Sequence, residues 1–227
     1  MIEIVKNNIS KIVTASVLIV LGVVGRLTLS ELLPSSPSFY ITLNGITQPM
    51  FMMDLFFLIA IISILSGLLL KSYYVFIVPL SIMLITDIII GNNYIFLFTW
   101  SGFAMIGLIG YILKIKNKFT MQKTPLIFGA GIGSVLLYDL WTNFGCWIGW
   151  YPHNLQGLSL CYTLAIPFTL WHLLSTTIAI TVIVLPILYL KEHKFIKLDY
   201  STKPIEKPIS ISLLAIIMFI SIALFFI

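Results

Sequence analysis

The sequence predicts an all-α fold, a polytopic membrane protein built as a bundle of transmembrane helices. Of its 227 residues, 59% are hydrophobic and 9% are charged, whereas soluble domains carry about 25% charged residues. The apolar runs are about 18–25 residues long, which suits helices that cross a bilayer core of about 30 Å. Membrane β-barrel strands alternate apolar and polar residues over segments of about ten residues. The apolar runs here do not alternate, so a barrel is excluded.

Seven apolar runs are expected to form the helices. The first follows Lys11, and no small-residue cleavage site comes after it, so we expect a retained helix rather than a signal peptide. The stretch from Pro34 to Pro37 ends it, because proline cannot continue a helix. Residues 71–72 and 91–93 are expected to be tight turns. The expected spans are residues 12–29, 50–70, 73–90, 94–113, 124–144, 165–190 and 209–227.

These spans divide the chain into three parts. Residues 1–190 are expected to form a six-helix transmembrane core, residues 191–208 a charged cytoplasmic linker, and residues 209–227 one additional C-terminal transmembrane helix. Within the core, residues 34–49 and 145–164 are expected to be outer loops. The second loop is rich in Trp, Tyr, Gly and Pro and is expected to hold a short interfacial helix near residues 158–164. Small residues allow close helix approach, which we expect at Gly102, Gly107, Gly110, Gly129, Gly131 and Gly133.

The lysines indicate the orientation in the membrane. With the N-terminus inside, every lysine falls in an inner segment and the outer loops hold none. The positive-inside rule therefore predicts a multi-pass cell-membrane protein with a cytoplasmic N-terminus and an external C-terminus. This sorting also explains the net charge of +5, so no nucleic-acid partner is predicted. The lysines are Lys6, Lys11, Lys71, Lys114, Lys116, Lys118, Lys123, Lys191, Lys194, Lys197, Lys203 and Lys207.

Four of the eight carboxylate residues sort to the opposite side. Glu31, Asp54, Asp87 and Asp139 come from four segments and are expected near the outer leaflet together with Arg26. An ionised side chain costs at least about 2.5–3.5 kcal/mol at a bilayer centre, so it normally faces the bundle interior or a wet cavity. The sequence therefore predicts an outward-facing polar pocket capped by aromatic loops. The candidate ligand-binding residues are Arg26, Asp87, Asp139, Asn143, Trp147, Tyr151, His153 and His172.

Each of these features also has a purely structural interpretation. Asp87 and Arg26 would then form an ion pair, and Asp139 and Asn143, one helical turn apart, would form a polar seam between helices. The tryptophans also fit an interfacial aromatic belt.

The cysteines and histidines leave further alternatives. Cys146 and Cys161 bracket one outer loop and either pair as a disulfide or remain free thiols. His153 and His172 lack the spacing of known metal sites, so neither a metal site nor a cofactor is predicted.

Three stretches carry a resemblance to a known family. They are Arg26 followed by LLPSSPSF (32–39), then ITDIIIG (85–91), then TNFGCWIGWYPHNLQGLSLCYTLAIPF (142–168). Together they resemble an uncharacterised prokaryotic six-helix membrane family, which is in turn similar to the substrate-binding (S) subunits of energy-coupling factor transporters. Residues 40–48 look like an insertion relative to that family, and the seventh helix is an addition. The positions that characterise the family's sequence pattern correspond here to Asp87, Asn143, Trp147, Tyr151, Pro152 and Gly157.

The resemblance implies a function and a partner. Such S subunits hold a vitamin or metal in an outward pocket and dock on a membrane coupling subunit driven by ATPases. We therefore expect an integral membrane solute-binding or transport subunit for a small vitamin-, metal- or cation-like molecule. The alternative is a non-catalytic accessory subunit of a larger membrane complex. A membrane enzyme using Asp87 or Asp139 with a histidine is a third hypothesis, but the sequence holds no GxSxG, Walker A or HExxH motif, so we expect no enzyme.

Overall fold

The computed structural model describes residues 2–33, 39–43, 46–70, 73–91, 93, 95–116 and 119–193. Side chains are described from Lys11 onward, except those of residues 43, 46 and 48. Most of the predicted linker, residues 194–208, and the predicted seventh helix, residues 209–227, lie outside the described residues. The three-part division of the chain therefore stays a prediction.

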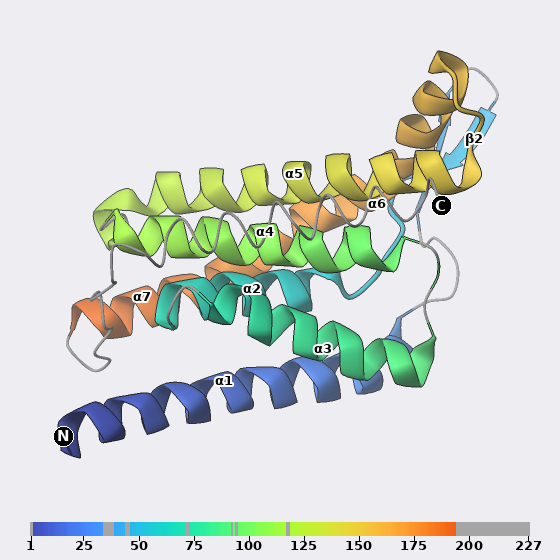
Figure 1. The fold of residues 1–227 in the computed structure, drawn as a ribbon. Coiled ribbons are helices and arrows are strands. Elements are labelled where there is room, and N and C mark those ends of the chain that lie inside the picture. The colour runs from blue at the N-terminus through green and yellow to red at the C-terminus, as the bar shows by residue number, and fades with distance from the viewer. Residues whose placement is uncertain are drawn as a thin grey trace.

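The predicted all-α membrane bundle is confirmed. Helices of the described chain run back and forth, so that their connections gather at two ends (Figure 1). Among the described residues, four continuous helical stretches are long and apolar enough to cross a membrane: Lys11–Leu32, Phe96–Ile115, Met121–Trp150 and Leu155–Glu192. The helices are α1 (Ile2–Leu29), α2 (Phe56–Leu69), α3 (Tyr74–Ile90), α4 (Phe96–Ile115), α5 (Thr124–Trp150), α6 (Leu155–Ala179) and α7 (Leu185–Glu192), with short helical turns η1 (Ser30–Leu32), η2 (Met121–Lys123) and the π-helical η3 (Ile180–Val184).

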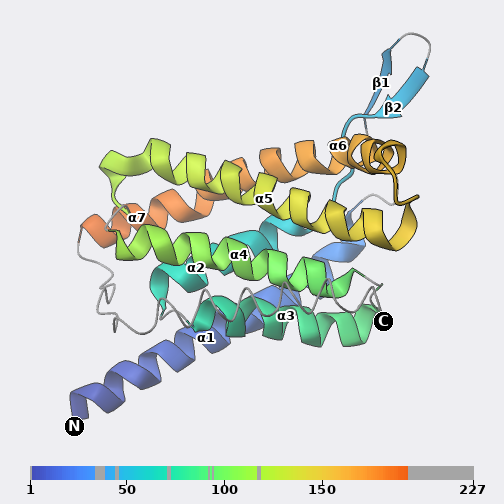
Figure 2. The ribbon, with the colours of Figure 1, turned by 45° about the horizontal axis from the view of Figure 1, so that its top comes forward.

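The two ends of the bundle differ in charge. We call the end where α1, α3 and α5 finish the hairpin end, because a β-hairpin projects from it (Figure 2). Arg26, Glu31 and Asp87 belong to the parts of α1, η1 and α3 nearest to it. The described lysines Lys114, Lys116, Lys123 and Lys191 belong to the helix ends and turns on the opposite side. The charge separation expected from the sequence is thus present along the bundle axis.

Glycines allow a close contact between α2 and α4. A Cβ atom on Gly67 would overlap the carbonyl oxygen of Gly107 and lie 2.5 Å from the amide nitrogen of Tyr111. A Cβ atom on Gly110 would lie 2.5 Å from the carbonyl oxygen of Ile64. The expected close approach at Gly107 and Gly110 is therefore confirmed. It places α2 in the centre of the bundle, where Ala60 and Leu68 are fully buried.

The expected packing at the start of α5 is only partly correct. Gly131 faces the Ile180 side chain at a separation too small for a Cβ atom. Gly129 and Gly133 meet no atom of the described residues within 4 Å. The helical repeat explains the difference, because residues two apart point about 200° away from each other.

The second helix starts later than predicted. Residues 50–55 are not helical, and α2 begins at Phe56 instead of Met50. Asp54 Oδ1 accepts a hydrogen bond of 3.0 Å from the Phe56 amide. A carboxylate is stable there because the helix N-terminus carries unpaired N–H groups and a partial positive charge. This start fixes Asp54 at the hairpin end of the bundle.

The predicted loop at residues 145–164 is wrong, but the short helix expected near residues 158–164 is present as part of α6. Helix α5 continues to Trp150 and α6 already begins at Leu155, so only residues 151–154 connect them. Asn154 caps α6, since its side chain accepts a hydrogen bond of 2.8 Å from the Gly157 amide. This aromatic segment has no charged residue, which suits an apolar setting. There its backbone N–H and C=O groups must bond to each other, and they do so because the chain remains helical. The asparagine cap was the local signal for the true boundary.

The predicted loop at residues 34–49 contains a β-hairpin. Strands β1 (Tyr40–Leu43) and β2 (Ile46–Pro49) are antiparallel, with Tyr40 opposite Pro49 and Leu43 opposite Ile46. In the sequence, Asn-Gly stands between the two strands, and this pair is the strongest short signal for a two-residue hairpin turn. The apparent insertion at residues 40–48 thus forms a local element of its own.

Helix α6 contains Pro167 and is bent (Figure 1). Proline lacks the N–H that would bond to the preceding turn, so it loosens a helix. The first turns of α6 stand at a steep angle to the remainder of the helix (Figure 1). The Pro167 carbonyl accepts a hydrogen bond of 3.3 Å from the Met52 amide. The bend therefore brings the segment before α2 against α6, a few residues from His172.

Candidate functional site

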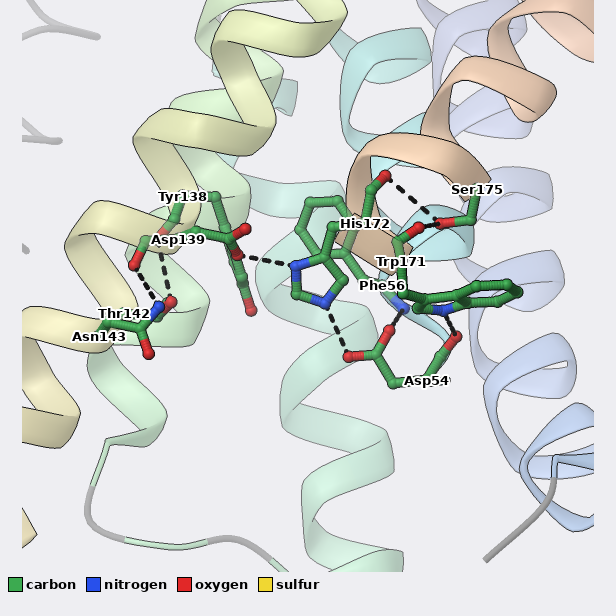
Figure 3. Close-up of polar contacts among 9 residues, drawn as sticks. All are labelled: Asp54, Phe56, Tyr138, Asp139, Thr142, Asn143, Trp171, His172 and Ser175. Atoms are coloured by element: carbon green, nitrogen blue, oxygen red, sulfur yellow. Dashed lines mark hydrogen bonds and ion pairs between the residues drawn. The ribbon is translucent and has the colours of Figure 1, made fainter. Parts of the chain in front are cut away.

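A histidine between two carboxylates lies inside the bundle. His172 Nδ1 is 2.7 Å from Asp139 Oδ1, and His172 Nε2 is 2.8 Å from Asp54 Oδ2 (Figure 3). We call these three residues the aspartate–histidine cluster. They come from α5, α6 and the segment before α2, so the cluster joins three parts of the chain. The side chains of His172 and Asp139 are each 8% exposed, whereas that of Asp54 is 40% exposed.

Aromatic residues and backbone groups hold the cluster in place. Phe56 stacks on the His172 ring with centroids 4.1 Å apart and an interplanar angle of 24°. Tyr138 meets the same ring edge-on at 6.1 Å. Trp171 Nε1 donates a hydrogen bond of 2.9 Å to the Asp54 carbonyl. The histidine ring therefore has little freedom to rotate away from either carboxylate.

A second charged group ties together α1, α3 and α4. Arg26 Nη1 lies 2.6 Å from Asp87 Oδ1 and also donates to the Thr86 hydroxyl. Trp100 Nε1 donates a hydrogen bond of 2.7 Å to Asp87 Oδ2. The side chain of Asp87 is 5% exposed and that of Arg26 is 22% exposed. The pairing of Arg26 with Asp87, weighed above as an alternative, is therefore present.

A cavity lies between the two charged groups. Its volume is about 240 Å³, and both Arg26 and Asp54 reach its wall. Residues from the end of α1 and the starts of α2 and α4 line it, which places it at the hairpin end. Aromatic rings and aliphatic side chains form the rest of the wall. The lining residues are Arg26, Asp54, Leu55, Phe56, Ile59, Met83, Asn93, Ile95, Thr99, Phe103 and Tyr138.

The eight candidate residues fall into two sets. Arg26 lines the cavity, and Asp87 contacts Arg26 directly. Asp139 and His172 do not line the cavity. His172 contacts both Asp139 and Asp54, and of these three residues Asp54 lines the cavity. The four residues Asn143, Trp147, Tyr151 and His153 do not line the cavity.

Those four residues instead shape the corner between α5 and α6. Asn143 Nδ2 donates 2.7 Å to the Asp139 carbonyl of its own helix. Trp147 Nε1 donates 3.0 Å to the Pro152 carbonyl, and His153 Nε2 lies 2.8 Å from the Ile148 carbonyl. Burial raises the pKa of the Tyr151 phenol, so that side chain stays neutral. The tryptophan-rich segment therefore does not line this cavity, and its capping role stays a prediction.

Several cavity residues were missed by sequence reasoning. Asp54 was grouped with the outer carboxylates but not chosen, and its position before Phe56 is a helix-start signal. Phe56, Phe103 and Tyr138 were not singled out, because aromatic residues in an apolar helix give no local sign that they face a cavity. Their role follows only from the tertiary arrangement.

The thiols and the cluster also bear on other chemistry. Cys146 and Cys161 are free thiols, so the disulfide alternative is not adopted here. Within the part of the chain that the structure describes, no group of three or more His, Cys, Asp or Glu side chains is arranged to hold a metal ion. Asp54 and Asp139 bind opposite nitrogens of one ring, so they do not converge on a common point.

Replacing Arg26 with glutamine is expected to lower the free energy of unfolding by about 3 kcal/mol or more. The change would leave the nearly buried Asp87 carboxylate without its cation. Thermal unfolding of the full chain in detergent measures the effect, with Glu31→Gln as the matched control, because Glu31 is an exposed carboxylate at the same end. The double variant Arg26→Met/Asp87→Leu should be more stable than Arg26→Gln, since replacing both partners avoids an unpaired buried charge. Equal stability of Arg26→Gln and Glu31→Gln would show that the pair contributes little.

A family model described as a family of unknown function (DUF6580) matches residues 6–198. Neither the curated proteins nor the solved structures contain a significant match to the chain.

Proposed function

Because the chain belongs to DUF6580, a family of unknown function, its role has to come from the site, and we propose that it is a membrane solute-binding or transport subunit. The observation that carries this proposal is the cavity of about 240 Å³ with Arg26 and Asp54 in its wall. Pockets for drug-sized ligands measure about 300–1,000 Å³, so the proposed ligand is a smaller solute. Ionisable residues inside a membrane bundle commonly mark such solute sites.

Charge and topology support the direction of capture. The lysine-rich end is assigned to the cytoplasm by the positive-inside rule, so the hairpin end and its cavity would face outward. The proposed mechanism is capture of the solute from outside, followed by reorientation of the bundle. In keeping with the resemblance to S subunits, a membrane coupling subunit with ATPases is one proposed source of energy, and an ion gradient is the other.

The arrangement of His172 supports binding rather than catalysis. A general base needs a ring nitrogen within reach of the substrate proton. Both nitrogens of His172 already face carboxylates, at 2.7 and 2.8 Å. The proposed role is therefore non-enzymatic.

Native mass spectrometry of the gently purified protein tests the proposal. We expect a co-purifying small molecule in the wild type and in the control Glu31→Gln. Thr99→Trp places a large ring in the cavity without altering a charge, and it should lose the molecule. Asp54→Asn should lose it as well, because Asp54 lines the cavity. Retention of the molecule in both cavity variants would rule out this cavity as the binding site.

The charge pairing also favours a second function, that of a non-catalytic accessory subunit of a larger membrane complex. Arg26 pairs with Asp87, and His172 pairs with both aspartates of the cluster. Such pairing stabilises a scaffold without any solute. Under this function the protein would co-purify with other membrane proteins and carry no small molecule. The loss of stability in Asp54→Asn would then be the same whether or not solutes are added.

A further inference from the structure

Resting on the proposed solute-binding function, we propose that the ligand of the cavity is a small amino acid in its zwitterionic form, with its carboxylate on Arg26 and its amino group on Asp54. Among the described residues, these two are the charged side chains of the cavity wall, and their charges are opposite. Most of the remaining wall is apolar and would hold the side chain of the ligand.

Arg26 has hydrogen-bond donors that the bundle does not use. A guanidinium carries five N–H donors, and the contacts of Arg26 with described residues all involve Nη1. Asp87 Oδ1 lies 2.6 Å from this nitrogen, Met83 Sδ lies 3.5 Å from it, and the Thr86 hydroxyl is the third partner. Nε and Nη2 have no acceptor within the described part of the chain. A carboxylate fits two such N–H groups in one bidentate contact.

The cavity meets the cation of the Arg26–Asp87 pair and not its carboxylate. Arg26 lines the cavity, whereas Asp87 does not. The second oxygen of Asp87 accepts a hydrogen bond of 2.7 Å from Trp100 Nε1, so both carboxylate oxygens are bonded within the bundle. The charge that this pair offers to a ligand in the cavity is therefore the positive one.

Asp54 has acceptor capacity facing the same cavity. A carboxylate offers about four lone-pair positions. Oδ1 accepts a hydrogen bond of 3.0 Å from the Phe56 amide, and Oδ2 lies 2.8 Å from His172 Nε2. About two positions therefore remain, on a side chain that is 40% exposed. An ammonium group suits these oxygens, because it has N–H donors and no acceptor.

The two wall charges together favour a zwitterion over a singly charged ligand. Ionised groups are costly inside a membrane bundle unless they are paired. A simple carboxylate would pair with Arg26 but bring a second negative charge beside Asp54. A simple amine would pair with Asp54 but bring a second positive charge beside Arg26. A zwitterion pairs both of its charges and adds no net charge.

The apolar wall indicates the size and the side chain of the ligand. Leu55, Ile59 and Ile95 contribute aliphatic groups, and Phe56 and Phe103 contribute aromatic rings. The volume of about 240 Å³ corresponds to about eight water molecules at about 30 Å³ each. This space suits an amino acid with an apolar side chain, such as leucine or phenylalanine.

Isothermal titration calorimetry of the full chain in detergent at neutral pH tests this assignment with matched probes. L-leucine carries both charges, 4-methylpentanoate lacks the amino group, and 3-methylbutylamine lacks the carboxylate. L-phenylalanine, 3-phenylpropanoate and 2-phenylethylamine repeat the series with an aromatic ring. We expect at least one zwitterion to bind at least about tenfold more tightly than both of its analogues, because each analogue loses one charge-assisted contact. If neither zwitterion is preferred over its analogues, the assignment is wrong.

Two variants test the two contacts separately. Arg26→Lys keeps a cation for Asp87 but has no planar fork for a carboxylate. It should weaken zwitterion binding at least about tenfold and change binding of the amine analogue by less than about twofold. Asp54→Asn should reduce zwitterion affinity to that of the carboxylate analogue. The control Glu31→Gln should bind all probes as the wild type does.

The probe series also covers variants that do not fold. If one variant is lost, the other variant and the wild-type series decide. Unchanged zwitterion binding in Arg26→Lys or in Asp54→Asn would overturn the contact that the variant removes, and with it the assignment.

The outcomes separate this inference from the proposed function. A co-purified amino acid that is lost in Thr99→Trp would support both. A co-purified molecule that is lost in Thr99→Trp but lacks a carboxylate or an amino group would overturn the zwitterion and leave solute binding intact. Absence of any co-purified molecule, together with failure of all the probes to bind, would overturn both.

Discussion

Replacing His172 with alanine is expected to lower the free energy of unfolding by about 3–5 kcal/mol, the usual cost of removing one partner from a buried charged pair. The change would leave the buried Asp139 without its neighbour at 2.7 Å and open a gap against the Phe56 ring, which stacks at 4.1 Å. It would also cut the link between α5, α6 and the start of α2. Thermal unfolding of the full chain in detergent, followed by retention on a sizing column, measures the loss.

His153→Ala is the matched control for this prediction. Its ring nitrogen contacts one backbone carbonyl and its side chain is exposed, so we expect a change within about 0.5 kcal/mol. A second comparison is the double variant Asp139→Leu/His172→Leu, which removes both buried polar groups and should be more stable than His172→Ala. If His172→Ala and His153→Ala unfold at the same temperature, the cluster does not stabilise the bundle.

Replacing Gly67 with valine is expected to destabilise the bundle by about 3 kcal/mol or more, at the upper end of the usual cost of overpacking. The new Cβ would overlap the Gly107 carbonyl oxygen and lie 2.5 Å from the Tyr111 amide nitrogen. Both are backbone atoms of α4, so no side-chain rotation relieves the clash and the two helices must separate. Because α2 and α4 both line the cavity, through Ile59 and Thr99, the cavity should change shape as well, and under the proposed function solute binding should fall.

Gly133→Val provides the control for Gly67→Val. Gly133 is an exposed helix residue with open space around its Cβ position among the described residues. Valine there should change the unfolding free energy by less than about 1 kcal/mol, because it relieves the helix cost of glycine without a clash. Comparable losses of unfolding free energy in the two variants would mean that the α2–α4 contact is not tightly packed.

Much of the architecture was accessible from the sequence because it depends on composition. Low charge and long apolar runs predicted a helical membrane bundle, and the structure confirms it. Helix boundaries near Asp54 and Asn154 were misjudged, since six residues of apolar or aromatic sequence look alike inside and outside a membrane helix. Capping side chains were the deciding signal in both places. The Asn-Gly pair likewise marked the hairpin.

The sequence by itself determined that this is a helical membrane protein in which the lysines sort away from the four carboxylates Glu31, Asp54, Asp87 and Asp139. Only the tertiary structure decided the pairings, since His172 bonds Asp54, 118 residues away, and Asp139, 33 residues away, while Arg26 takes Asp87. The reason is that a membrane helix is apolar on its lipid face and on its packed face alike. Its sequence therefore does not reveal its rotation, and the bend of α6 and the contacts of α2 set which charges meet.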